Sequence, residues 1–264
     1  MTDPIIRICD YSFCLGGKAI LQHISLTLER GEYLSIIGPN GAGKTTLLKC
    51  LDGIYQKGSS GAIEIKGRPL EGYSRRDLAK LVSYVPQGDG GSFPFMVKEF
   101  VLMGRYPYLS PFSSVSRQDK EAVFSALDLT GTAELGDRYL DTLSGGERQK
   151  VFIAAALAQG AEIILLDEPT AFLDPKHEEA IYRILGRVNR DSDTTVISVT
   201  HDINHAVLVS RRILALKGGR VVFCGPSGEI IQQEGVLQEI YEKSFQFLRH
   251  PETGRPFVVP ELIL

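Results

Sequence analysis

Residues 38–45 have the sequence Gly-Pro-Asn-Gly-Ala-Gly-Lys-Thr, a pattern typical of phosphate binding. The glycines permit backbone torsions that aim successive amide N–H groups at phosphate oxygens. Lys44 would bring a positive charge to the β- and γ-phosphates, and the Thr45 hydroxyl would ligate Mg²⁺. We name residues 38–45 the phosphate loop and expect it to bind a nucleoside triphosphate with Mg²⁺. The expected contacts are Gly38, Pro39, Asn40, Gly41, Ala42, Gly43, Lys44, Thr45 and Thr46.

Two adjacent acids, Asp167 and Glu168, follow the apolar run Ile163–Leu166. Ligands of open α/β sheets bind at the carboxyl ends of the strands. We therefore expect Asp167 to face the metal and Glu168 to reach a water aligned with the γ-phosphate. A solvated strand end is the plain alternative, which the phosphate loop in the same chain makes less favourable.

A third motif, Leu-Ser-Gly-Gly-Glu-Arg-Gln at residues 143–149, precedes a predicted helix over Lys150–Gln159. Ser144 and Glu147 have the spacing of a capping box. Gly145 and Gly146 leave the start of the helix bare, so its N–H groups could meet an anion. Two phosphate-binding ends in one chain suggest that two copies pair head to tail and complete each other's sites. An ordinary capped helix is equally compatible with these residues alone.

The elements that would position these motifs are short apolar strands alternating with helical patterns, of which Asp119–Leu129 is one example. This alternation predicts an α/β fold with a parallel sheet. The predicted parallel strands are Tyr33–Ile37, Val82–Val85, Ile163–Leu166 and Thr195–Val199.

Other segments predict a different structure. Alternating patterns over residues 5–30 and Ala62–Lys66 predict antiparallel strands, and Lys217–Arg220 predicts a hairpin turn. Residues 88–112 are rich in Gly and Pro and predict an irregular segment. The tail after Pro226 predicts short helices followed by an extended end.

Composition excludes several classes of protein. The formal charge of −3 shows no basic excess, so we expect no nucleic-acid partner. The four cysteines match no paired zinc pattern and are interpreted as reduced thiols. The N-terminus has no signal-peptide pattern, and apolar runs such as Val151–Ala158 are far shorter than the roughly 20 residues needed to span a bilayer. We expect a cytoplasmic protein.

Together, these motifs resemble the ATP-binding cassette (ABC) ATPases over residues 5–225, and residues 143–149 are similar to that family's signature motif. The family order is also met by Walker A at 38–45, Walker B at 163–167 and a D-loop at 171–174. The resemblance implies a P-loop NTPase fold with a RecA-like parallel-sheet core, an antiparallel β subdomain and an inserted α-helical subdomain. It further implies a single ABC ATPase domain over 1–264, divided into a core with the β subdomain (1–87 and 160–225), a helical subdomain (88–159) and a C-terminal extension (226–264).

The resemblance also assigns roles to residues. Glu168 would polarise the attacking water, His201 would contact the γ-phosphate, and Gln87 would sense Mg²⁺ and that water. The implied ligands are ATP and Mg²⁺, with Thr45, Asp167 and Gln87 at the metal. The residues implied at the contact with a second copy are Ser144, Gly145 and Gly146, which would hold the partner's γ-phosphate, and Asp174, which would cross the interface.

Three features depart from this pattern or allow another interpretation. His201 and His205 are four residues apart and could form a metal pair, but no third ligand accompanies them. Leu15 stands where the family has an adenine-stacking aromatic residue, for which Tyr11 or Phe13 could substitute. The D-loop has Phe172 where a small residue is common.

Residues 101–112 and the tail at 250–254 resemble ATPase subunits of importers for iron–siderophore complexes, haem and cobalamin. This implies polytopic permease partners, an extracytoplasmic substrate-binding protein reached indirectly, and a place at the cytoplasmic face of the membrane. Several apolar side chains could receive a permease helix in a groove, or could pack within the helical subdomain. They are Phe93, Phe95, Met96, Tyr106, Tyr108 and Phe112.

Two other classes of ABC protein share part of this pattern. A soluble ABC ATPase that remodels a protein assembly, such as iron–sulfur cluster machinery, would share every nucleotide-binding residue. A chromosome-maintenance or DNA-repair ABC protein would need long heptad repeats, and none lies between Lys44 and Ser144.

Overall fold

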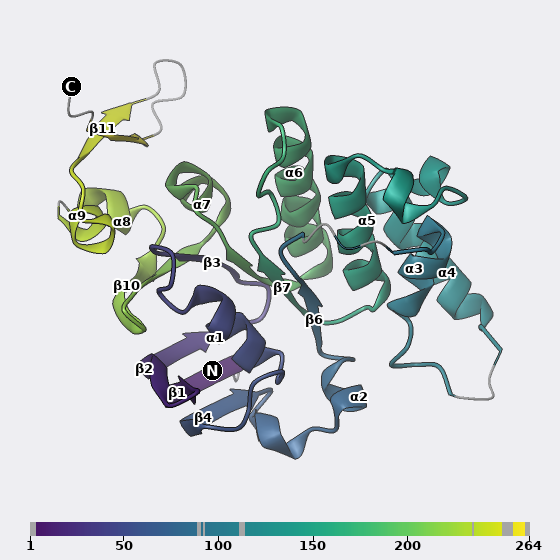
Figure 1. Ribbon diagram of the computed structural model, residues 1–264, viewed down its shortest axis with the longest axis horizontal. Coiled ribbons are helices and arrows are strands. Elements are labelled where there is room, and N and C mark those ends of the chain that lie inside the picture. Colours follow the sequence, from purple (N-terminus) through teal and green to yellow (C-terminus); the bar gives the residue numbers. More distant parts are fainter. Residues whose placement is uncertain are drawn as a thin grey trace. The chain divides into compact units, whose positions relative to one another are not determined.

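The computed structural model describes residues 4–88, 91, 93–110, 114–233, 235–249 and 256–261. The chain forms two compact units. Unit 1 comprises residues 1–70 and 197–264, and unit 2 comprises residues 71–196. Figure 1 traces the chain and labels its elements. The finer division into core, helical subdomain and C-terminal extension stays a prediction.

The first sheet of unit 1 is antiparallel and has the strand order β2-β1-β4-β5. Its bounds are β1 Ile6–Leu15, β2 Lys18–Leu28, β4 Ser59–Ile65 and β5 Arg68–Pro69. Ile6 and Ile8 are buried while Arg7 between them is exposed, as the alternating sequence predicts. The predicted antiparallel strands are confirmed.

The parallel strands of unit 1 lead to the phosphate loop. Strand β3 (Tyr33–Ile37) is buried along its whole length and runs parallel to β9 (Arg212–Lys217). The turn after β9 leads into β10 (Arg220–Pro226), which pairs with it antiparallel, so the predicted hairpin is confirmed. Strand β8 (Thr195–Val199) crosses the division between the units. Just after β8, Thr200 N–H donates to the Ile36 carbonyl at 3.1 Å, so β3 and β8 end at one edge.

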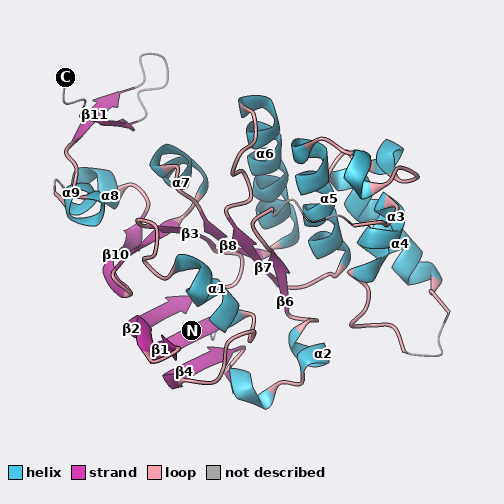
Figure 2. Cartoon of the chain, viewed as in Figure 1, coloured by secondary structure: helices cyan, strands magenta, loops and turns pink. Residues whose placement is uncertain are grey.

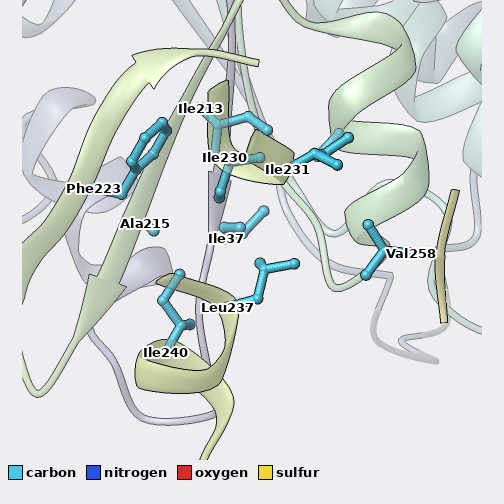
Figure 3. Close-up of a cluster of buried hydrophobic side chains, with 10 residues drawn as sticks. Ile37, Ile213, Ala215, Phe223, Ile230, Ile231, Leu237, Ile240 and Val258 are labelled. Carbon is cyan, nitrogen blue, oxygen red and sulfur yellow. The ribbon is translucent and has the colours of Figure 1, made fainter. Parts of the chain in front are cut away.

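The C-terminal segment of unit 1 packs onto these strands. It contains α7 (Ile203–Val209), α8 (Glu229–Gln232), α9 (Val236–Tyr241), β11 (Phe245–Arg249) and β12 (Pro256–Pro260). Figure 3 shows the buried cluster that joins them, in which Ile37 of β3 and Ile213 of β9 lie among Ile230, Leu237 and Val258. The predicted short helices and extended end are confirmed, and the extended end is an antiparallel hairpin. Residues 250–255 lie outside the described part.

Unit 2 contains a parallel strand pair and several helices. Strand β6 (Val82–Val85) runs parallel to β7 (Ile163–Asp167). Figure 2 distinguishes the helices of this unit from its strands. The helical elements are α2 Arg75–Leu78, α3 Val97–Met103, α4 Arg117–Leu129, α5 Gly145–Ala158, α6 Pro175–Ser192, η2 Ala133–Leu135 and η3 Leu140–Thr142, while η1 Leu70–Gly72 lies at the unit boundary.

A buried ion pair holds helices α3, α4 and α5 together. Arg105, just after α3, donates from Nε to Asp119 Oδ1 of α4 at 2.9 Å and from a terminal nitrogen to the Ala158 carbonyl of α5 at 2.8 Å. Both side chains are at most 8% exposed. A single guanidinium therefore ties the end of one helix, the start of a second and the end of a third.

Two predictions about this unit need correction. The irregular structure predicted for 88–112 is wrong for Val97–Met103, where Val97 and Val101 are buried one turn apart and Glu99 accepts from the Met96 N–H at 2.9 Å. The helix predicted over Lys150–Gln159 begins earlier, at Gly145, because Ser144 caps it. The described helices include none with the length and apolar character needed to cross a bilayer.

Candidate nucleotide-binding site

Two glycines of the phosphate loop stand where a side chain would collide with a neighbouring strand. Gly38 has φ of 144°, and a Cβ built on it would lie 2.1 Å from the Leu216 carbonyl oxygen of β9. Gly43 has φ of 100°, and its Cβ would lie 2.8 Å from a methyl carbon of Leu21. The loop is therefore pressed against neighbouring strands at both ends, which fixes the direction of its backbone groups.

Lys44 lies inside this loop. Its side chain is 6% exposed, and its Nζ donates to the carbonyls of Gly38 at 2.7 Å and Pro39 at 3.0 Å. It is also the first residue of α1 (Lys44–Leu51), whose N-cap is Gly43. A buried cation at a helix N-terminus inside a glycine-rich loop is suited to a phosphate group, so the loop fits the predicted nucleotide.

His201 follows Thr200 at the edge where β3 and β8 end, and it is exposed. Its neighbour Asp202 is the N-cap of α7 and accepts from the His205 N–H at 2.9 Å. Nδ1 of His205 also lies 2.9 Å from Asp202, and this hydrogen bond lowers the pKa of the Asp202 carboxyl. His205 thus serves the helix cap, which gives no support to a metal pair with His201.

The two acids at the end of β7 are each held by a side chain from the β6 segment of the same unit. Gln87 donates from Nε2 to Glu168 at 2.8 Å, and the Tyr84 hydroxyl donates to Asp167 at 3.1 Å. Asp167 is 3% exposed. The structure thus brings together Gln87, Asp167 and Glu168, three of the predicted site residues.

Tyr84 is a residue that our sequence interpretation missed. The sequence alone carried no signal for it, because the contact depends on the parallel register of β6 and β7, in which Tyr84 lies opposite Leu165, two residues before Asp167. Carboxylate and amide oxygens are hard donors of the kind that Mg²⁺ prefers, so this group fits the predicted metal. Thr45 belongs to unit 1, and the complete metal site stays a prediction.

The predicted capping box at the start of α5 is confirmed. Ser144 Oγ accepts from the Glu147 N–H at 3.3 Å, while Glu147 accepts from the Ser144 N–H at 2.9 Å and hydroxyl at 2.7 Å. These bonds from Ser144 hold the pKa of the Glu147 carboxyl below its usual range. Ser144 and Gly145 are exposed. We name residues 144–146 the signature end.

The signature end packs against the start of α6. A Cβ on Gly146 would lie 2.3 Å from ring atoms of His177, so only glycine fits there. Asp174 is the N-cap of α6, accepting from the His177 N–H at 3.1 Å and lying 2.7 Å from its Nδ1. Those contacts with His177 lower the pKa of Asp174. The predicted roles of Asp174 and the signature end toward a second copy remain predictions.

The expectation that Tyr11 or Phe13 could stack on adenine is wrong. Tyr11 is 3% and Phe13 is 1% exposed, and the Phe13 ring stacks on Tyr55 with centroids 5.3 Å apart. Both rings are buried in the antiparallel sheet, although the alternation of β1 is interrupted between Ile8 and Tyr11, where the strand register shifts. Leu15 is half exposed.

The apolar side chains of 93–112 divide between core and surface. Phe93 packs edge-on against Phe100 and Phe152, which confirms the packing interpretation for that ring. Tyr106 and Tyr108 are exposed. Tyr106 lines a groove of about 810 Å³ whose other walls are Arg75, Arg76, Ala79, Pro107, Leu109 and Ser110. Phe112 lies outside the described residues.

Comparison with known proteins decides the family. The protein-family model described as ABC transporter matches residues 21–171. The chain belongs to the ABC transporter family. Its predicted P-loop fold and its class as an ATP hydrolase are thereby confirmed, as is the binding of ATP.

Similar proteins extend over most of the chain. The iron(3+)-hydroxamate import ATP-binding protein FhuC of Bacillus subtilis is 36% identical and aligns with 91% of this chain and 89% of its own length. An inward-facing ABC transporter assigned to the metal-chelate type is 27% identical, covers 99% of both chains and has a TM-score of 0.85. A bacterial ABC transporter cassette solved as a dimer is 28% identical, covers 84% of this chain and 98% of its own, and has a TM-score of 0.73.

Proposed function

We propose that this chain is the ATP-hydrolysing subunit of a membrane importer for a metal chelate of the iron–siderophore, haem or cobalamin type. The observation that carries the catalytic part is the 2.8 Å hydrogen bond between Gln87 and Glu168. It places the amide assigned to sensing water and metal directly on the carboxylate assigned to polarising the water. Similarity to FhuC and to the metal-chelate type transporter supports the choice of cargo.

The chemistry is transfer of the γ-phosphoryl group to water, which depends on positioning and on neutralisation of charge. Lys44 and the amides of the phosphate loop bind the phosphates, and Glu168 orients the attacking water. Asp167, Thr45 and Gln87 are the residues that would hold Mg²⁺, and the ion would supply positive charge to neutralise the developing charge on the phosphate oxygens. Ser144 and Gly146 of a second copy complete the site around the γ-phosphate.

The work of the ATPase is done on a permease at the cytoplasmic face of the membrane. The groove beside Tyr106 and Arg76 is a suitable place for a permease helix, because it joins apolar walls to arginine side chains. Gln87 precedes that helical region in the chain, so changes at the γ-phosphate reach it through the segment after β6. An extracytoplasmic binding protein is engaged only through the permease.

The variant Glu168→Gln tests the catalytic assignment. It keeps the shape of the side chain, so it should bind ATP, lose hydrolysis and accumulate as an ATP-bound dimer in sedimentation velocity. Glu179→Gln, an exposed position on α6, is the matched control and should turn over normally. Normal turnover by Glu168→Gln would remove Glu168 from its role. Co-purification with a cytosolic assembly instead of a polytopic membrane protein would favour the remodelling class.

A further inference from the structure

Helix α9 shares a buried cluster with the strand that leads into the phosphate loop. Leu237 and Ile240, which lie on one face of this helix, belong to the same cluster as Ile37, the last residue before the loop. Figure 3 shows these side chains together, and each of them is at most 1% exposed. Because close-packed interiors transmit displacement, the positions of α9 and of the start of the phosphate loop depend on each other.

Lys217 ties the same helix to the end of β9. Its Nζ donates to the Glu239 carbonyl at 2.6 Å and lies 2.8 Å from a carboxylate oxygen of Glu242. The hydrogen bond and the charge of Lys217 lower the pKa of Glu242. Lys217 directly follows Leu216, whose carbonyl oxygen fills the space beside Gly38. The end of α9 is therefore attached to the strand against which the phosphate loop is pressed.

Tyr241, the last residue of α9, brings a hydroxyl to the phosphate loop. Its ring packs on the same buried cluster and lies edge-on to Phe245, with centroids 5.9 Å apart. Burial raises the pKa of Tyr241 to about 12, and the nearby backbone of Gly38 opposes this rise. The hydroxyl is itself buried and makes no hydrogen bond of ordinary geometry to any residue that the structure describes. A buried hydroxyl without such a bond costs stability.

Strand β12 makes a second connection, to α7. The Asn204 side chain of α7 donates from Nδ2 to the Val258 carbonyl at 3.0 Å, and the Val258 N–H donates to Asn204 Oδ1 at 2.7 Å. Val258 is 3% exposed and belongs to the cluster that contains Ile37. Helix α7 begins two residues after His201. We name α9 and β12 together the C-terminal brace, because they contact both the phosphate loop and the helix next to His201.

We propose that the C-terminal brace positions the nucleotide site of unit 1, with Tyr241 as a positioning residue that bonds the Gly38 backbone when the phosphate loop closes on ATP. The inference rests on the proposed function, which assigns the phosphates of ATP to Lys44 and His201. Tyr241 acts through Gly38 and is not a catalytic residue. A hydrogen bond that is made in only one of two states shifts the equilibrium toward that state, so this bond would favour the ATP-bound loop.

The variant Tyr241→Phe removes the hydroxyl and keeps the ring. The dissociation constant for ATP should rise about fivefold, as expected for the loss of one hydrogen bond. The melting temperature of the nucleotide-free protein should stay the same or rise, because the variant removes a buried hydroxyl that lacks a well-formed bond. Titration calorimetry and thermal melts would measure the two effects. A purely structural role would instead lower the melting temperature and leave the affinity unchanged.

The matched control is Tyr55→Phe. Tyr55 is another tyrosine of unit 1, and its ring stacks on Phe13 of β1. This variant also loses one phenolic hydroxyl, and its affinity for ATP should equal that of wild type. An equal loss of affinity in both variants would mean that the effect of Tyr241→Phe is not specific to the phosphate loop, and would overturn the proposal.

The variant Asn204→Ala tests the other connection of the brace. It removes both hydrogen bonds to Val258 and loosens α7, so turnover should fall about tenfold through misplacement of His201. The affinity for ATP should stay within about twofold of wild type, because the contacts of α9 with the phosphate loop are kept. A lower melting temperature with unchanged turnover would overturn the role of the brace at α7.

The outcomes separate this proposal from the one on which it rests. If Tyr241→Phe binds ATP as tightly as wild type, the brace does not position the phosphate loop, and the proposed function is untouched. If the wild-type chain binds ATP but never hydrolyses it, even with a membrane partner, the proposed function fails. In that case the ATP affinities of wild type and Tyr241→Phe still test the brace.

Discussion

The phosphate loop of unit 1 and the signature end of unit 2 both place glycines at the start of a helix, but they are built in opposite ways. In the phosphate loop, the buried ammonium of Lys44 is held by backbone carbonyls. In the signature end, exposed Ser144 is bonded to the carboxylate of Glu147. The first end therefore carries a positive charge toward its ligand, and the second already carries a negative one.

This difference indicates a division of labour. A cation at a helix N-terminus attracts a phosphate by itself, whereas a carboxylate there already satisfies the helix dipole and disfavours a further anion. We infer that the phosphate loop captures the nucleotide, and that the signature end adds its donors only after another part of the molecule has brought the phosphate to it.

The largest expected effect tests the capture step. Lys44→Ala removes the buried cation, and the affinity for ATP should fall about 100-fold or more, since charge-assisted bonds are the strong ones. Titration calorimetry with ATP would measure it. Lys49→Ala, farther along α1, should bind normally. If Lys44→Ala binds ATP as tightly as wild type, the phosphate loop does not capture the nucleotide through this cation.

The variant Ser144→Ala tests the role of the signature end. Turnover should fall roughly tenfold or more, because one donor to the transferred phosphate is lost, while the ATP affinity of the monomer should be unchanged. The lost cap should cost about 1 kcal/mol of stability.

Ser116→Ala is the control for that cost. Ser116 caps α4 with the same type of capping box, formed with Asp119. It should lose similar stability and keep its turnover. If both serine variants lose turnover equally, Ser144 is only a helix cap.

The third prediction concerns stability of the helical region that carries the signature end. Asp119→Asn weakens the buried pair with Arg105, and the free energy of unfolding near pH 7 should fall by roughly 2 kcal/mol. Hydrogen bonds from Ser116, then from Arg105, lower the pKa of Asp119. Its contribution is therefore present above the usual aspartate pKa of about 4 and is lost as the pH falls through the lower folded value.

Thermal melts of wild type and Asp119→Asn at several pH values would measure this effect. The difference between the two melting temperatures should be largest near neutrality and should shrink below about pH 4. A difference that is independent of pH would mean that the carboxylate charge contributes nothing.

The smallest expected effect is that of Tyr84→Phe, which removes only the hydroxyl on Asp167. The Mg²⁺ concentration that half-activates hydrolysis should rise about threefold, as expected for loss of one hydrogen bond to a charged group. Mg²⁺-dependent protection of ATP-bound protein against proteolysis should shift in parallel. Tyr55→Phe, in unit 1, is the control. No shift would leave Tyr84 as a packing residue.

The sequence predicts well those features that follow from local pattern. Buried strands such as Tyr33–Ile37 are nearly continuous apolar runs. The cap of α5 follows from the types and spacing of Ser144 and Glu147 alone. The helix at Val97–Met103 was missed because Gly and Pro surround it and its evidence is burial of two valines by distant residues. Likewise, the burial of Tyr11 and Phe13 is decided by strand pairing and tertiary packing.

Site residues divide in the same way. Residue types and spacing were enough to nominate Lys44, Asp167 and Glu168. The hydrogen bonds from Tyr84 and Gln87 depend on the parallel register of β6 and β7, which cannot be predicted from the sequence. The exposure of Phe172 likewise needed coordinates, although its unusual type at that position was visible beforehand.

The central claim is that Lys44 of one copy and Ser144 of another act on the same phosphate, and mixing the two impaired variants Lys44→Ala and Ser144→Ala tests it most directly. In a mixed dimer of Lys44→Ala and Ser144→Ala, one site would have both defects and the other would have neither. An equimolar mixture should therefore recover about a quarter of wild-type ATPase activity, since half of the dimers are mixed and each has one intact site of two. Activity no greater than the average of the two separate variants would contradict the account.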